Sequence, residues 1–245
     1  MDVSRTYNKI LAVVMLVLIA AALPVSAQQR NDKLLNRPYS DLRPWHLGFS
    51  IGVHTQDLQI THNGFVTENG ETWFMEQPAF SPGFCVNGLL DLRLNNYFSI
   101  RFTPGMYFGN RVIKMHDTTG GGVQQQNLKT NLVVVPVDVK FASMRYHNAR
   151  PYLVAGAMVT FDVSKRRPRD LLQLKSTDFL LTAGFGCDFY LPFFKLCPEL
   201  KFCFGLTDVL KHDRPDFVDD PDGIKYTQSI KKAVTQMVVL TFYFE

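Results

Sequence analysis

Apolar residues occupy every second position in eight stretches of the chain. In the first stretch Trp45, Leu47, Phe49, Ile51 and Val53 alternate with polar or small residues. Because successive side chains of a β-strand point to opposite faces, each stretch predicts a strand with one apolar and one polar face. Each has close to the roughly ten residues that cross a lipid bilayer at a tilt. The eight expected strands cover residues 45–60, 84–94, 98–108, 133–141, 153–161, 179–189, 196–206 and 234–244.

The connections between these strands alternate in length. The second, fourth and sixth connections are short and lie at residues 95–96, 145–150 and 192–195. Outer-membrane barrels show this asymmetry, with short periplasmic turns and long extracellular loops, and an even strand number places both termini in the periplasm. The pattern therefore predicts an all-β, eight-stranded antiparallel up-and-down transmembrane β-barrel over residues 45–245, in the outer membrane. The four long connections span roughly residues 61–81, 110–129, 164–176 and 208–229.

A soluble antiparallel sandwich or a lipocalin-like barrel would show the same alternation. Such a fold would bury the apolar face and leave the charged residues of the polar face on the surface. The asymmetry of the connections and an N-terminal export signal favour the membrane barrel.

That export signal occupies the first 27 residues, which have the pattern of a secretory signal peptide. A positively charged start is followed by an apolar run from Ile10 to Leu23 and a small-residue cleavage site at Val25-Ser26-Ala27. We expect the mature chain to begin at Gln28, with residues 28–44 forming a polar periplasmic tether. An uncleaved anchor is the alternative, but the apolar run is short for a membrane span.

Composition excludes some partners without choosing a fold. The chain is 46% hydrophobic and 20% charged, which is ordinary for a globular protein. Its net charge of +4 is too small to indicate a nucleic-acid partner, and export from the cytoplasm also argues against one. Cys85, Cys187, Cys197 and Cys203 lack the paired spacing of a zinc site, so they are either disulfide-bonded or small apolar fillers within strands.

The polar faces of the expected strands carry charged residues that would point into the lumen of a membrane barrel. Side chains fill the interior of an eight-stranded barrel, so we expect no water-filled pore. Charges buried in such a core must pair, because an isolated buried charge is very costly. The eight expected lumen charges are Asp91, Arg93, Arg101, Asp138, Lys140, Asp188, Glu199 and Lys201.

Turn geometry predicts which of these charges meet between the second and third strands. A three-residue turn at Leu94-Asn95-Asn96 fits the parity of the flanking side chains, with Asn96 in the left-handed conformation. This register places Asp91 diagonal to Arg101, and we predict an ion pair between them.

The same counting across the turn at residues 192–195 places Asp188 opposite Glu199, with Lys201 diagonal to Asp188. Two facing carboxylates can share a proton and do acid/base work. A filled lumen admits no substrate, however, so we interpret the group as a structural network neutralised by Lys201 and its neighbours.

Candidate catalytic groups lie near the expected outer rim or in its loops. They are His54, Asp57, His62, His116 and Asp117. A histidine with a carboxylate can act as a general base, as in an outer-membrane enzyme that modifies lipid or peptide at its rim. No nucleophile motif accompanies these residues, so we favour histidines without catalytic work and assign no catalytic residue.

Two of the expected loops have a distinctive composition. Residues 165–169, with the sequence KRRPR, could contact the phosphates of a surface glycolipid or simply be solvated. A group of aspartates could gather Ca²⁺, contact a partner or be solvated, and it does not match the EF-hand pattern. We expect no bound metal, no cofactor and no small-molecule substrate. The aspartates are Asp213, Asp216, Asp219, Asp220 and Asp222.

Three segments together resemble the PorT family of Bacteroidota outer-membrane barrels. They are residues 43–54 (RPWHLGFSIGVH), the pair FSPGF and LDLRL within residues 80–94, and the ending LTFYFE at 240–245. The ending is also similar to the terminal strand by which outer-membrane barrels are recognised for insertion. It departs from that pattern because Phe244 is followed by Glu245.

The resemblance implies a component of the type IX secretion system, which exports proteins bearing a C-terminal sorting domain and is tied to gliding in some relatives. It carries over no catalytic residue. Our hypothesis is a non-enzymatic membrane-embedded component of this machinery that contacts outer-membrane lipid, and other secretion-system proteins through its loops or tether. A rim enzyme and a structural or adhesive OmpA-like barrel are the competing interpretations.

Overall fold

The computed structural model describes residues 36–65, 72–76, 81–117, 123–164, 172–211 and 229–245. Within them a 3₁₀ helix, η1 (Ser40–Leu42), precedes ten β-strands. No helix in these ranges is long and apolar enough to cross a membrane. The strands are β1 (Trp45–His62), β2 (Trp73–Glu76), β3 (Pro82–Arg93), β4 (Phe98–Phe102), β5 (Gly105–Asp117), β6 (Val123–Ala142), β7 (Ala149–Asp162), β8 (Thr177–Tyr190), β9 (Lys195–Gly205) and β10 (Ile230–Phe244).

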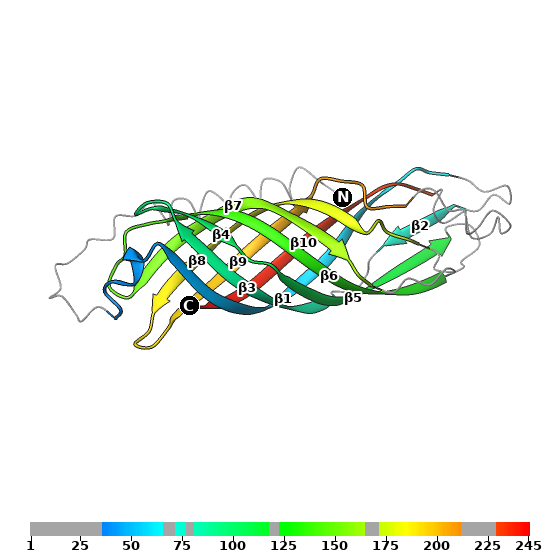
Figure 1. The fold of residues 1–245 in the computed structure, drawn as a ribbon. Coiled ribbons are helices and arrows are strands. Elements are labelled where there is room, and N and C mark those ends of the chain that lie inside the picture. Colours follow the sequence, from blue (N-terminus) through cyan, green and yellow to red (C-terminus); the bar gives the residue numbers. More distant parts are fainter. Residues whose placement is uncertain (1–35, 66–71, 77–80, 118–122, 165–171, 212–228) are drawn as a thin grey trace, which may run out of the picture. The chain divides into compact units, whose positions relative to one another are not determined.

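The strands form one antiparallel sheet that closes on itself (Figure 1). β1 pairs with β10 on one side and with β3 on the other, which joins the two edges. β4 and β5 share one position in the barrel, because both pair with β3 and with β6. β2 is an additional short strand beside β5. The prediction of an eight-stranded antiparallel up-and-down barrel is therefore confirmed.

Two ends of the barrel can be told apart by their connections. The turn end carries the short connections β3–β4, β6–β7 and β8–β9, together with the start of β1 and the end of β10. The loop end carries the connections that follow β1, β5, β7 and β9, much of which lies outside the described residues. The connections after β1, β7 and β9 are long, as the sequence predicts, whereas the connection between β5 and β6 is short.

The third expected strand, over residues 98–108, is interrupted at Thr103–Pro104 and continues as β5. Proline has no backbone N–H and cannot donate to the ladder. Its carbonyl still accepts a hydrogen bond of 2.8 Å from Gly88 N–H, so β3 stays attached across the break.

The long loop expected at residues 110–129 is wrong, because β5 extends to Asp117 and β6 begins at Val123. The alternation does not stop near residue 110 but changes face. Met106 on this strand points outward and is exposed, whereas Ile113 and Met115, further along, point inward and are fully buried. The expected loop at 61–81 likewise contains β2, which pairs with β5.

Most of the barrel wall near the turn end has an apolar outer surface. Phe49 is 56% exposed and Phe185 is 53% exposed, and similar side chains on the other strands are exposed in the same way. Arg101 on the inner face is fully buried. A soluble sandwich or lipocalin-like barrel would have the opposite arrangement, so that alternative is wrong.

Near the loop end the interior is apolar instead. Residues of β1, β2, β5 and β10 pack there with residues of the connections that follow β7 and β9. The outward side chains of the same strand segments, such as Asp57, Lys114 and Lys232, are polar and exposed. This buried group is Leu58, Trp73, Met75, Ile113, Met115, Leu172, Val209, Leu210, Ile230 and Ala233, and we call it the loop-end core.

Candidate functional site: the charged interior and the turn end

Seven of the eight expected lumen charges are buried inside the barrel. The exception is Arg93, which lies half-exposed at the turn end and donates to the carbonyl oxygens of Leu42 (3.1 Å) and Asn95 (3.3 Å). The seven come from β3, β4, β6, β8 and β9, so the closed barrel brings together charges that are far apart in the sequence.

Arg101 on β4 is the centre of this group. Its guanidinium donates to Asp91 (3.1 Å from Nη2 and 3.2 Å from Nε) and to Glu199 (2.7 Å). It also donates to the hydroxyl of Tyr152 at 3.3 Å and lies 4.8 Å from the ring centroid of Tyr243. The expected ion pair between Asp91 and Arg101 is formed. Glu199, on the opposite side of the barrel, is a second carboxylate that binds the same guanidinium.

The two lysines of this group, Lys140 and Lys201, bind the carboxylates of different strands. Lys140 donates to both oxygens of Asp188 at 2.7 and 2.9 Å. Lys201 donates to Asp138 at 2.6 Å and forms an ion pair of 3.2 Å with Glu199. Hydrogen-bonded pairing of this kind is what allows charged groups to remain in a solvent-poor interior.

Two members of the network were not among the expected lumen charges. Lys195, the first residue of β9, pairs with Glu245 and lies 3.9 Å from Asp188. Glu245 also lies 3.6 Å from Arg101. The sequence pattern places Lys195 in a turn, and Glu245 stands out in it only as a departure from a terminal aromatic residue. Both residues keep the alternation of the inward-facing positions on β9 and β10. Extending that alternation beyond the ends of the apolar runs would have identified Lys195 and Glu245 as lumen charges.

The register of the first turn differs from expectation by two residues. Asp91 lies directly opposite Arg101 rather than diagonal to it, because the turn consists of Asn95, Asn96 and Tyr97. Asn96 does not take the left-handed conformation. Instead the Asn95 side-chain oxygen accepts from the backbone N–H groups of Tyr97 (2.8 Å) and Phe98 (2.7 Å), a turn that aspartate and asparagine favour.

The predicted pair of facing carboxylates is also wrong. Glu199 lies opposite Gly186, and the turn spans residues 191–194, since Tyr190 pairs with Lys195. Asp188 lies opposite Arg150 on β7 and is bound by lysines, with no diagonal contact to Lys201. Lys195 stays in the strand because its ammonium group finds two carboxylates inside the barrel.

Gly186 leaves room for the aromatic ring that organises the network. Tyr152 donates its hydroxyl to Glu199 at 3.0 Å and receives the hydrogen bond from Arg101. A Cβ atom at position 186 would lie 2.5 Å from the hydroxyl oxygen and from Cζ of Tyr152. No real Cβ contact is that short, so only glycine fits without displacement of the ring.

The described part of the expected tether folds against the turn end. Asn36 donates its side-chain amide to the carbonyl of Tyr190 at 3.0 Å, and Arg37 donates to the carbonyl of Glu245 at 2.9 Å. Asp41 in η1 accepts from the Tyr190 hydroxyl at 2.5 Å and lies 3.5 Å from Arg150. Residues 36–44 are thus attached to three parts of the barrel instead of hanging free.

The interior at this end has little free space. A pocket lined by network residues and by the surrounding turns has a volume of about 40 Å³. A second pocket near the loop end, beside Arg111 and Asp178, has about 30 Å³. Each volume fits about one to a few water molecules. The described interior therefore offers no passage for a folded protein.

The structure separates the expected rim catalytic residues. His54 is buried and stacks on Tyr107 with ring centroids 5.0 Å apart, while Asp57 is exposed on the outer face of β1. His62 Nε2 accepts from the backbone N–H of Met75 at 2.9 Å. These positions do not bring His54 and Asp57 together as a base and its carboxylate.

His116 and the neighbouring Phe74 also attach β2 to the barrel. The Phe74 ring lies 5.0 Å from that of His62 and 6.2 Å from that of His116. Asp117 pairs with Trp73 through the backbone ladder. These contacts give the two rim histidines a structural position between β1, β2 and β5.

The cysteines and possible metal ligands can be placed as well. All four cysteines are free thiols, and Cys85, Cys197 and Cys203 are buried. Among the described residues, no group of three or more His, Cys, Asp or Glu side chains could hold a metal ion. The basic loop at 165–169, the aspartates at 213–222 and the signal peptide at 1–27 lie outside the described residues.

Comparison with protein-family models agrees with this architecture. The model of a family described as "Outer membrane protein beta-barrel domain" matches residues 26–211. Among solved structures, the chain is similar to the N-terminal beta-barrel domain of OprF from Pseudomonas aeruginosa, with 13% identity and a TM-score of 0.35. That match covers 80% of this chain and 97% of the other. No curated protein matches the sequence.

Proposed function

Because the chain belongs to the outer membrane protein beta-barrel domain family, we propose that it is a non-enzymatic outer-membrane component of a protein secretion machinery. It acts through contacts with other proteins and does not form the conduit itself. The observation that carries this proposal is the filled interior, where the charged network and the loop-end core occupy the space along the barrel axis. Exported cargo needs a partner that supplies the channel.

The turn end supports a role in protein contact. Phe193 at the tip of the β8–β9 turn is 93% exposed, and Met144 and Tyr146 in the β6–β7 turn are also exposed. Tyr39 beside η1 is exposed at the same end. Solvent disfavours such apolar side chains, and their grouping is typical of a protein or membrane contact surface.

We further propose that the turn end and both ends of the barrel chain face the periplasm, as short turns do in this class of barrel. Single cysteines at Phe193 and Asn63 test this orientation, because both positions are exposed and lie at opposite ends. In intact cells a membrane-impermeant thiol reagent should label Asn63→Cys and spare Phe193→Cys. The reverse labelling would contradict the orientation.

The finer assignment to type IX secretion rests on the sequence resemblance in residues 43–54, 80–94 and 240–245. Deletion of the gene should leave cargo with C-terminal sorting domains in the periplasm. Secretion that continues normally in the deletion strain would exclude this role. Proteins that co-purify from solubilised outer membrane identify the partners, and Phe193→Ser combined with Tyr146→Ser should weaken that co-purification.

A rim enzyme makes a different prediction from the secretion component. His54→Ala and His116→Ala should leave cargo export unchanged, provided that the variants reach the membrane. Loss of export in a variant that is correctly assembled would point to a chemical role for these histidines.

A further inference from the structure

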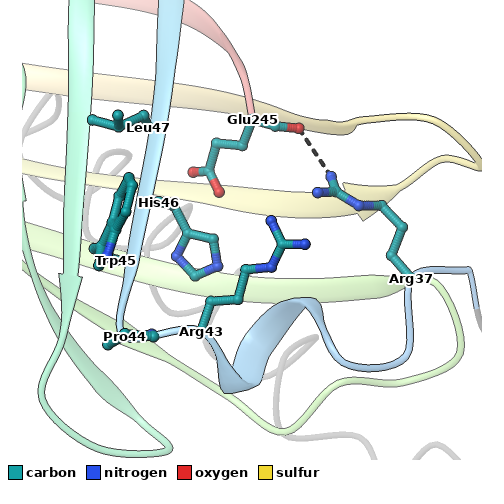
Figure 2. A pocket seen from close by; sticks show the side chains of 7 residues that line it. All are labelled: Arg37, Arg43, Pro44, Trp45, His46, Leu47 and Glu245. Atoms are coloured by element: carbon teal, nitrogen blue, oxygen red, sulfur yellow. Dashed lines mark hydrogen bonds between the residues drawn. The ribbon is translucent and has the colours of Figure 1, made fainter.

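A pocket of about 480 Å³ lies at the turn end, where the expected tether joins β1. Its lining combines two arginines with aromatic and aliphatic side chains from the start of β1 (Figure 2). Figure 2 shows Arg37 and Arg43 reaching the pocket from the two sides of η1. The pocket borders the charged network at Glu245 and η1 at His46, whose Nε2 lies 2.9 Å from the carbonyl oxygen of Ser40. The lining residues are Arg37, Arg43, Pro44, Trp45, His46, Leu47 and Glu245.

The pocket has an uncompensated positive charge. Arg43 is exposed, and the ion pairs among the described residues of this rim do not include it. Arg37 donates to the main-chain oxygen of Glu245, the final residue of the sequence, which leaves Arg43 to supply the free positive charge of the pocket. The Glu245 carboxylate is directed to Lys195 and Arg101 inside the barrel and is therefore already paired.

The surrounding rim strengthens this positive field. Arg93, Arg145 and Arg150 also lie at the turn end, and many of their hydrogen bonds go to backbone carbonyls. The described carboxylate that pairs with rim arginines is Asp41, which lies 3.5 Å from Arg150 and 4.0 Å from Arg145. An anion that approaches this end of the barrel is attracted by several guanidinium groups.

The other side of the pocket continues into the lipid-facing wall. Trp45 is 54% exposed and Leu47 is 60% exposed, and they begin the outward row that continues through Phe49. Aromatic side chains at this level are typical of the interface between the hydrocarbon and the headgroups. A molecule bound here would place an anionic group at the arginines and an apolar chain along β1.

We propose that this pocket binds the phosphate headgroup of an anionic phospholipid, with its acyl chains lying on Trp45, Leu47 and Phe49. The continuity of the pocket with the lipid-facing row selects a lipid over a soluble anion. The arginines select a headgroup with net negative charge over a zwitterionic one. The inference rests on the proposed placement of the turn end at a membrane surface.

Trp45 can report its own surroundings, because the chain has two tryptophans and the other, Trp73, lies in the loop-end core. In a Trp73→Phe background, the full-length protein is reconstituted in phosphatidylcholine vesicles. One set of vesicles contains brominated phosphatidylglycerol and the other contains brominated phosphatidylcholine. In both lipids the bromine lies near the top of the acyl chain, where it quenches the fluorescence of a nearby tryptophan. We expect stronger quenching by the brominated phosphatidylglycerol.

Arg43→Gln should reduce this preference for phosphatidylglycerol about fivefold, the effect expected for one guanidinium near an anionic surface. Arg93→Gln is the matched control, because it removes the same charge from the same rim but does not line the pocket. It should retain most of the preference. An equal fall in both variants, or no fall in Arg43→Gln, would overturn the proposed site.

Two further readouts keep the outcomes distinct. Equal quenching by both lipids would leave the membrane placement intact and exclude the lipid site, whereas no quenching by either lipid would contradict the placement itself. Inorganic phosphate, compared with chloride at equal ionic strength, should not relieve the quenching. Relief would show a site for free phosphate and would contradict the lipid.

Native mass spectrometry of protein with Trp73 intact gives an independent measurement. The natural protein should retain phosphatidylglycerol that Arg43→Gln loses. Equal retention by both proteins would contradict the site even if the Trp73→Phe background fails to fold.

Discussion

Along a single strand of this barrel, the inner and outer faces exchange their apolar and polar side chains between the turn end and the loop end. In β1 the outward residues from Trp45 to Val53 are apolar and exposed, and the interior at that level holds ion pairs. Beyond Thr55 the outward residues Asp57 and Gln59 are polar, while the inward Leu58 belongs to the loop-end core. The strand continues without a break through this change.

The difference shows how the surroundings of the barrel set its composition. Where the outer wall faces lipid, apolar side chains are needed outside, and polar groups can be placed inside if they pair. Where the wall faces water, the ordinary rule of an apolar interior returns. The apolar outward row of β1 covers about the nine to eleven residues that span a bilayer. We infer that the change of face marks the edge of the hydrocarbon.

The two interiors should respond differently to substitution, and the charged one should respond most strongly. Arg101→Met leaves Asp91, Glu199 and Glu245 without their shared cation. Loss of one member of a buried ion pair costs about 3–5 kcal/mol. Guanidinium titration of the vesicle-inserted protein, followed by tryptophan fluorescence, measures the loss of unfolding free energy.

Arg93→Met is the control for this substitution, because Arg93 is half-exposed and bonds to carbonyls at the rim. Its effect should stay within about 0.5 kcal/mol, as for an ordinary surface site. Similar losses for Arg101→Met and Arg93→Met would mean that the network does not hold the interior together.

The loop-end core should behave like the core of a soluble protein. Ile113 is fully buried there, and truncation of such a side chain to alanine costs about 3 kcal/mol through lost burial and the cavity left behind. The neighbouring Val112→Ala, at a half-buried position, should cost clearly less. The same titration measures both, and a larger loss for Val112→Ala would contradict the assigned inward face.

A smaller loss is expected from Gly186→Ala, about 2 kcal/mol, because the new methyl group forces the Tyr152 ring out of position. Tyr152→Leu removes the atoms that the methyl group would meet. If the clash is the cause, the two substitutions together should cost less than the sum of their separate losses. Additive losses in this double-mutant cycle would exclude the clash.

The fold follows from the sequence because alternation and connection length act locally and agree with each other. The paired network was harder to predict. Two-residue register shifts preserve the parity of every side chain, so parity alone could not distinguish Asp188 opposite Glu199 from the observed partners. The contact of Arg101 with Glu199 joins β4 to β9, which only closure of the barrel brings together.

The change of face explains the remaining differences. The sequence prediction follows apolar residues on the outer face of this strand only, so it ends the strand at Phe108. It misses the rest of β5, where Ile113 is apolar on the inner face. β2 is only four residues long, and its place depends on His62 and His116, which the sequence suggested as candidates for chemistry. Rim histidines with a structural role could not be told from catalytic ones by their residue type.

The position of the hydrocarbon edge on β1 is the central claim, and two lysine substitutions on its outer face test it most directly. Ile51 and Gln59 both point outward, on either side of the change of face. Ile51→Lys should destabilise the folded protein in vesicles, lowering its free energy of unfolding by about 2–4 kcal/mol, the cost of a lysine on the lipid face near the bilayer midplane. Gln59→Lys should change it by less than about 1 kcal/mol. Equal costs at the two positions would contradict the account.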